Sequence, residues 1–100
     1  VMDVGGDLLT LLRMDGMTGG AVDVAVAKAR SAAKFGFPSA VFSEEVGKGV
    51  VAVLGLPNVM PFPGGVPLTV GDVMVGVVGV SGASPDVDGA IAQTAAGVLR

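Results

Sequence analysis

The loop at residues 63–67, with the sequence PGGVP, is the first feature of the sequence that could do chemistry. Gly64 and Gly65 are adjacent, and consecutive glycines can turn their backbone N–H groups toward one point, where they bind an anion. Pro63 and Pro67 restrict the flanking backbone and so lower the entropy lost on binding. A rigid turn between two strands is the alternative, and the sequence leaves both interpretations open.

Lys28, Ser39 and Arg13 could supply a charge or a hydroxyl group. Lys28 lies in an alanine-rich stretch, where a lone lysine is more often a surface residue. Ser39 has no histidine to activate it, because the sequence contains none, so ordinary nucleophilic catalysis is not expected. Arg13 and Asp15 are two residues apart, and we expect an ion pair between them at the end of a strand.

The sequence also lacks cysteine. Without cysteine and histidine, the usual zinc sites and all disulfides are excluded, and we expect no metal site. The lack of disulfides fits a reducing compartment, so we expect a cytoplasmic location. The methionines are dispersed, and we expect Met14, Met60 and Met74 to fill gaps in the core.

Charge and length limit the partners of this chain. Its 100 residues fit one domain, residues 1–100. The net charge is −3, and the only close basic residues are Lys28, Arg30 and Lys34, which is typical of a solvated helix face and not of a nucleic-acid site. We therefore expect no binding of nucleic acid.

The hydrophobic content is 51% and the mean hydropathy is +0.76, which is high for a short chain. The longest uncharged run, Gly49–Gly71, contains four prolines, and these prevent a membrane-spanning helix. Because a small domain cannot bury all of this apolar surface, we expect the surplus to contact a ligand or another subunit, as in a homo-oligomer.

Turn and cap signals predict the elements that must position these residues. A hairpin is predicted over 1–4 and 7–14 around two glycines, and a helix over 20–35 that ends at Gly36. A short helix is predicted from Pro38 and Ser39 toward Val46, and the segment after it is ambiguous between helix and strand. Strands are predicted from residue 58 onward, above all over 72–81, and a final helix over 85–98 begins at a Ser-Pro-Asp cap. The order β-β-α-α-β-β-β-α predicts an α+β fold with helices packed on an antiparallel sheet.

Four runs of the sequence together resemble one family. They are GGDLLTLLRMDGM, AVAKARSAAKFGFPS, FPGGVPL and VMVGVVGVSGASPDVDGAIA, and they span nearly the whole chain in the family's order. The sequence is similar to the GlcG/HbpS-like family, which includes the C-terminal domain of PduO-type proteins and is often labelled haem-degrading or haem-binding.

The resemblance implies a profilin-like fold, with a five-stranded antiparallel sheet flanked by helices, and assembly into homo-oligomers. It also implies a helix before the first strand, which this sequence lacks. Haem or a corrinoid-related tetrapyrrole is the implied cofactor. In the family pattern, the matching positions Lys28, Ser39, Pro63, Gly64 and Gly65 cluster near a pocket.

Three functions follow from these expectations. The first is a binding protein for a small acidic molecule or a tetrapyrrole, with its pocket near the PGG loop at a subunit interface. There Lys28 would hold a carboxylate or propionate, the amides of Gly64 and Gly65 would assist, and Ser39 would complete the contact. The second is an enzyme that acts on a small carboxylate, with Lys28 as anchor or acid–base group. The third is a structural accessory subunit with a vestigial pocket.

Overall fold

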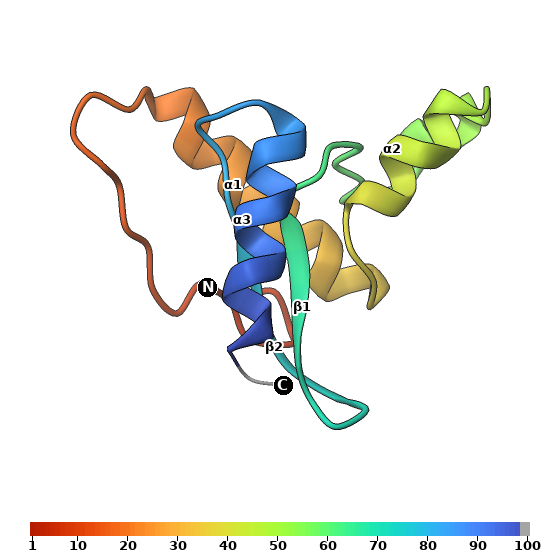
Figure 1. Cartoon of the computed structure of the whole chain (residues 1–100). Helices are drawn as coiled ribbons and strands as arrows, with labels where there is room; N and C mark the ends of the chain where they lie inside the picture. Colours follow the sequence, from red (N-terminus) through yellow and green to blue (C-terminus); the bar gives the residue numbers. More distant parts are fainter. Residues whose placement is uncertain (99–100) are drawn as a thin grey trace.

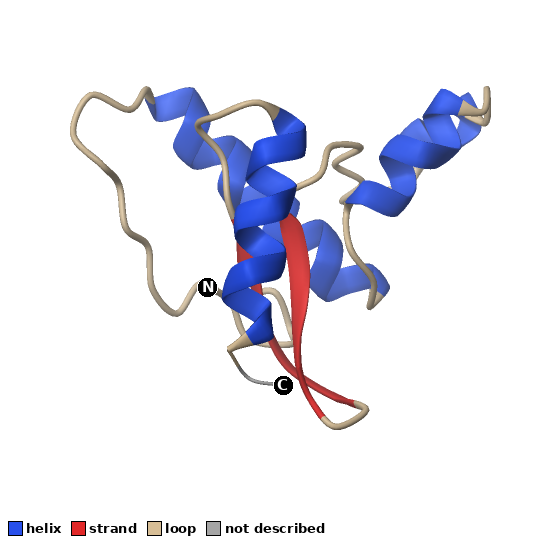
Figure 2. Ribbon diagram, viewed as in Figure 1, coloured by secondary structure: helices blue, strands red, loops and turns tan. Residues whose placement is uncertain are grey.

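An antiparallel hairpin forms the centre of the molecule, as Figures 1 and 2 show. It consists of β1 (Gly65–Val70) and β2 (Val73–Gly79), with Gly65 opposite Gly79. The computed structural model describes residues 1–98. The hairpin confirms the strand that the sequence predicts most clearly, and α1 (Gly19–Phe35), α2 (Ala40–Gly47) and α3 (Pro85–Gly97) confirm the three predicted helices and the α+β class.

Two helices cover the two faces of this hairpin. On one face, Val77 of β2 lies in a buried cluster with Met2 and with Ala29, Ala32 and Ala33 of α1. On the other face, Val66 of β1 packs on Ala92 and Ala96 of α3. The small side chains of both helices let their backbones come close to the strands, as expected of an alanine-rich helix.

Gly79 shows why the hairpin needs glycine. A Cβ atom at this position would collide with the backbone oxygen of Ala25 in α1. A glycine inside a strand costs conformational entropy, so its presence marks a place where another backbone approaches closely. At Gly79 that neighbouring backbone is the one of α1.

Cap residues set the helix ends. The Thr18 hydroxyl accepts the N–H of Ala21 at the start of α1 (3.2 Å), and Gly36 ends that helix with φ of 77°. Ser84 accepts the N–H of Val87 at the start of α3 (3.4 Å), with Pro85 as the next residue. The caps at Gly36 and Ser84 are the ones that the sequence predicts.

The predicted hairpin over 1–4 and 7–14 is confirmed only next to its turn, where the N–H of Asp3 donates to the oxygen of Asp7 and the N–H of Leu9 to the oxygen of Val1. Met2 makes single bridges to Leu8 and Val77, but residues 9–14 have no regular structure. Leu12 is 91% exposed, so no neighbouring strand covers this segment in residues 1–98.

Residues 58–62, also predicted as a strand, are irregular, and the ambiguous segment before them is a 3₁₀ helix, η1 (Val51–Gly55). The sheet of the described residues therefore has two strands, and the expected five strands are not shown.

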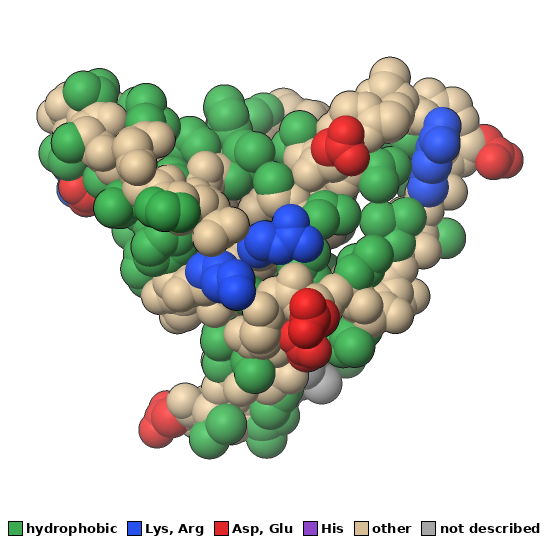
Figure 3. All heavy atoms as spheres, turned by 180° about the vertical axis from the view of Figure 1, so that it is seen from behind, with side chains coloured by type: hydrophobic (Ala, Val, Ile, Leu, Met, Phe, Trp, Pro, Cys, Tyr) green, Lys and Arg blue, Asp and Glu red, His purple; other side chains and the backbone are tan. Residues whose placement is uncertain are grey.

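Much of the apolar surface stays exposed, as the hydropathy predicts. Exposed large apolar side chains include Leu9, Leu12, Val73 and Val98. Figure 3 shows hydrophobic side chains in several places on the face opposite to that of Figure 1, between the charged groups. Among the described residues, no helix combines the length and apolar character that crossing a bilayer requires.

Candidate functional site: a braced apolar cavity

Lys28 of α1 is buried, so its interpretation as a surface residue is wrong. Its side chain is 2% exposed and lies between α1 and the start of α3. The Nζ atom donates to Oδ2 of Asp88 (3.1 Å) and to the backbone oxygen of Val80 (3.2 Å). A buried ammonium needs such partners, because burial removes its hydration.

Ser39 and the paired glycines lie beside Lys28. The hydroxyl of Ser39 accepts the N–H of Gly65 (2.9 Å) and donates to the backbone oxygen of Phe62 (2.7 Å). The N–H of Ser39 donates to the oxygen of Gly65 (2.9 Å). Of the two amides of the expected anion site, the N–H of Gly65 is therefore not free to bind an anion, because it already donates to Ser39.

Gly64 and Pro63 complete this cluster. A Cβ atom on Gly64 would lie 2.7 Å from Cδ of Lys28, so only glycine leaves room for the lysine side chain. Pro63 lies against Gly89 of α3, where an added Cβ would be 2.8 Å from the proline ring. The structure thus brings all five predicted residues together, and their contact with a ligand stays a prediction.

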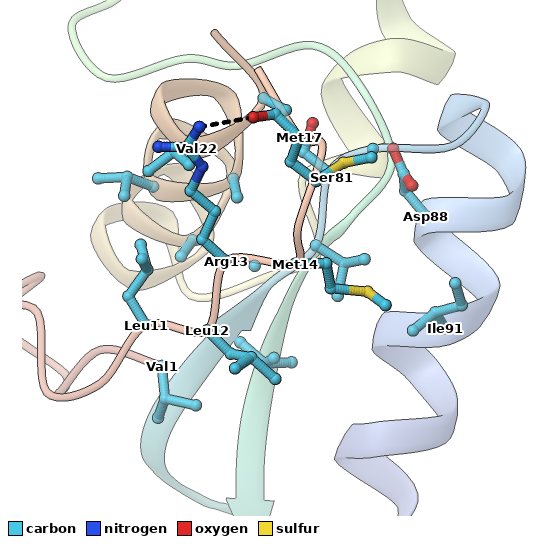
Figure 4. A pocket seen from close by; sticks show the side chains of 18 of the residues that line it. Val1, Leu11, Leu12, Arg13, Met14, Met17, Val22, Ser81, Asp88 and Ile91 are labelled. Atoms are coloured by element: carbon cyan, nitrogen blue, oxygen red, sulfur yellow. Dashed lines mark hydrogen bonds between the residues drawn. The ribbon is translucent and has the colours of Figure 1, made fainter. Parts of the chain in front are cut away.

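A largely apolar cavity of about 510 Å³ lies beside this cluster. Its walls come from the N-terminal segment (residues 8–17), the first half of α1 and residues 78–83. Figure 4 shows Leu11 and Leu12 on one side, Asp88 and Ile91 of α3 on the other, and Met14 between them. The volume lies within the range of ligand pockets, about 300–1,000 Å³.

The five predicted residues stand behind the cavity wall and do not line it. Val80 and Asp88 do line it, and Lys28 binds both of them. All buried side-chain nitrogen and oxygen atoms of the described residues have a hydrogen-bond partner. The five residues therefore form a polar cluster whose buried side-chain atoms all have hydrogen-bond partners, and this cluster lies behind the apolar wall of the cavity.

Arg13 and Asp88 are the charged side chains that line the cavity. The expected ion pair of Arg13 with Asp15 is wrong, because Nη2 of Arg13 instead donates to the backbone oxygen of Met17 (2.8 Å). Val1 also lines the cavity, and its backbone nitrogen donates to the oxygen of Thr10 (2.9 Å).

Sequence reasoning missed the role of the N-terminal segment. Met14, predicted to fill the core, is 70% exposed and lines the cavity together with Met17. The signal was present in the run LLRM, where two leucines and one methionine flank a single arginine without a clean strand alternation. Such a segment is too apolar for a free loop and lacks the period of a strand.

The comparison with family models decides the relationship. The model described as "Haem degrading protein HbpS-like" matches residues 1–97. The chain belongs to the HbpS-like family. The resemblance found in the sequence is thereby confirmed.

Solved structures share the fold of this HbpS-like chain. Klebsiella pneumoniae protein ORFY gives a TM-score of 0.87 at 27% identity, covering 98% of this chain and 70% of that one. A PduOC:haem complex gives 0.84 at 26% identity, with 99% and 75% covered. A double mutant of Streptomyces reticuli HbpS gives 0.84 at 30% identity, with 99% and 68% covered. No curated protein matches the chain as a relative.

At the cavity of this HbpS-like chain, few kinds of side chain could bind a metal ion or haem iron. The sequence contains no histidine, cysteine or tyrosine, and residues 1–98 contain no group of three acidic, histidine or cysteine side chains that could hold a metal ion. The softest donors that line the cavity are the thioethers of Met2, Met14 and Met17, of which Met2 is fully buried in the core. Methionine is one of the side chains that bind haem iron.

Proposed function

We propose that this protein binds a small acidic molecule of the tetrapyrrole class, with haem as the leading candidate, in the apolar cavity between the N-terminal segment, α1 and β2. The observation that carries the proposal is the cavity itself: about 510 Å³, lined mainly by apolar side chains, with the Arg13 guanidinium among them. A tetrapyrrole has a broad apolar ring and carboxylate groups, which match these two features. The PduOC:haem structure supports the same ligand class.

The residues present fit a haem. Leu11, Leu12 and Ile91 give the apolar walls, and Met14 and Met17 offer thioether donors from the same segment. When bound, haem supplies an iron centre that can exchange electrons and bind small ligands. The residues of this chain would hold the ring, exclude water from it and orient its carboxylates.

We propose that the five predicted residues do not contact the ligand but hold the residues of the cavity wall in place. Lys28 fixes Val80 and Asp88, and Ser39 fixes Gly65 at the start of β1. In this arrangement Lys28 holds the carboxylate of Asp88 and not that of the ligand. In this proposal the pocket lies next to the loop at residues 63–67, and the loop holds the wall of the pocket in place.

Binding is favoured over the other two functions. A catalytic Lys28 would have to leave Asp88 to reach a substrate, and a catalytic Ser39 would have to leave Gly65 and Phe62. An accessory subunit with a vestigial pocket does not require a cavity of ligand size, and this chain has one.

We further propose a homo-oligomer. Val87 and Ile91 of α3 form an exposed apolar stripe with Val98, the residue directly after that helix, and the N-terminal segment adds exposed leucines. Burial of such surface against another subunit is favourable, at about 25 cal/mol per Å² of apolar area. A subunit interface at the cavity, a corrinoid ligand and a cytoplasmic location stay predictions from the sequence.

A haemin titration tests the binding function. Haemin added to the protein should give a shifted, saturable Soret band. Ala21 lines the cavity from α1, so Ala21→Trp should fill the cavity and abolish the band shift. Glu44→Trp, on the exposed side of α2, adds the same ring elsewhere and should leave it unchanged. Equal binding by both variants would contradict the proposed site.

A further inference from the structure

We propose that the Arg13 guanidinium is the anchor for a carboxylate of the ligand, so that the cavity selects apolar molecules that carry a carboxylate. The inference rests on the binding function proposed above. It adds the group that a ligand must possess and the residue that recognises it.

Two charged side chains of opposite sign line the cavity. Of the side chains that line it, only Arg13 and Asp88 are charged. They come from opposite parts of the chain, Arg13 from the N-terminal segment and Asp88 from the first turn of α3. Figure 4 shows Arg13 beside Val22 of α1 and Asp88 on the far side of the cavity. An acidic ligand would be attracted by the first and repelled by the second.

The charge of Asp88 is already compensated. Its Oδ2 atom faces Nζ of Lys28 at 3.1 Å, and its Oδ1 atom accepts the N–H of Ala83 at 2.9 Å. The residue is 2% exposed. With both oxygens occupied by donors, one of them cationic, Asp88 exerts little net repulsion on an acidic ligand.

The charge of Arg13 is not compensated within residues 1–98. Neither of the two ion pairs there includes it. Its one hydrogen bond in that part of the chain goes to the neutral backbone oxygen of Met17, and this bond fixes one edge of the guanidinium. A guanidinium has five N–H donors in a planar fork, so several remain for the two oxygens of a carboxylate.

Position and surroundings fit such an anchor. Arg13 is an exposed residue on the cavity lining, between Leu12 and Met14. A carboxylate bound there keeps contact with solvent, while the apolar body of the ligand enters among Leu11, Leu12 and Ile91. The cavity therefore fits amphipathic carboxylic acids, of which porphyrins with propionate groups are one class.

Protoporphyrin IX and its dimethyl ester are the probes that test the anchor, because they differ only in the free carboxylates. Binding is measured by porphyrin fluorescence, with detergent conditions matched for both probes. The protein should bind the acid at least about tenfold more tightly than the ester, since a hydrogen bond to a charged group gives such a factor. Arg13→Gln should lower the affinity for the acid alone and so remove this preference, whereas Arg13→Lys should keep part of it.

Lys48→Gln is the matched control, because it removes one positive charge at the exposed end of α2. It should retain the full preference for the acid. Unfolding midpoints of all variants should agree with that of the parent chain, which shows that the cavity is intact.

Two results would overturn the anchor and leave the binding function standing. One is an Arg13→Gln variant whose affinities for the acid and the ester fall equally, which would show that Arg13 contributes only to the cavity wall. The other is a preference for the acid that survives Arg13→Gln. If the parent chain binds neither probe, nor haemin, both the anchor and the proposed function are refuted.

Discussion

The ammonium of Lys28 and the carboxylate of Asp88 lie 3.1 Å apart in the interior, although 60 positions separate them in the sequence. The pair joins α1 to the first turn of α3 beside the start of β1. Gly64 passes so close to the lysine side chain that a Cβ atom there would lie 2.9 Å from Nζ. This contact explains why the loop that could bind an anion instead makes room for a cation of the same chain.

Breaking this pair should destabilise the fold. Lys28→Met leaves the buried carboxylate of Asp88 without its cation, and we expect a loss of about 3–5 kcal/mol in the free energy of unfolding. Urea unfolding measures it. Lys48→Met removes the exposed partner of Glu45 and should cost less than about 1 kcal/mol.

The double variant Lys28→Met with Asp88→Asn separates charge from packing. Asparagine keeps the side-chain shape but needs no cation, so the double variant should be more stable than Lys28→Met alone. If Lys28→Met unfolds no more easily than Lys48→Met, the pair does not brace the cavity wall.

Gly65 should tolerate no side chain. A Cβ atom there would collide with the backbone oxygen of Lys28, and backbone cannot move aside as a flexible side chain can. We expect Gly65→Ala to lose at least about 1–3 kcal/mol of unfolding free energy. Gly47→Ala, at the end of α2 where the added Cβ meets nothing within 4 Å, should be neutral or stabilising. Equal effects of the two changes in thermal unfolding would contradict the packing of β1 on α1.

Ser39 should contribute to stability and not directly to ligand affinity. Ser39→Ala leaves the N–H of Gly65 and the oxygen of Phe62 without their partner, which should cost about 1–3 kcal/mol. Haemin affinity, measured where the variant is fully folded, should stay within a few-fold of the parent value. A large loss of affinity with unchanged stability would restore Ser39 as a ligand contact.

The thioethers of Met14 and Met17 should matter for iron only. A variant with leucine at both positions keeps the apolar lining, so it should bind metal-free protoporphyrin IX as the parent does. With haemin it should show a Soret band typical of iron without a thioether ligand. Identical haemin spectra of variant and parent would exclude both methionines as ligands.

Elements with local signals could be predicted from the sequence. Gly36 and Ser84 are cap residues whose effect is limited to one helix turn, and they predicted the end of α1 and the start of α3. The strand over 73–79 followed from its branched apolar residues. These features depend on neighbours in the sequence, which reasoning from the sequence can use.

Features that depend on distant partners could not be predicted. Nothing in the alanine-rich stretch around Lys28 indicates Asp88, and the burial of Lys28 follows only from the packing of α1 between the hairpin and α3. The segment around Leu12 was predicted as a strand from its apolar residues although it lacks a clean alternation, but a strand needs a paired neighbour, and residues 1–98 give it none beyond the bridge at Leu8.

An NMR titration of ¹⁵N-labelled protein with protoporphyrin IX tests directly whether the ligand enters the cavity. We expect saturable shifts of the backbone amides of residues 10–17 and 78–83, which border the cavity, and no shifts of the amides of α2. Shifts confined to α2, or to the outer stripe of α3 at Val87 and Val98, would contradict it.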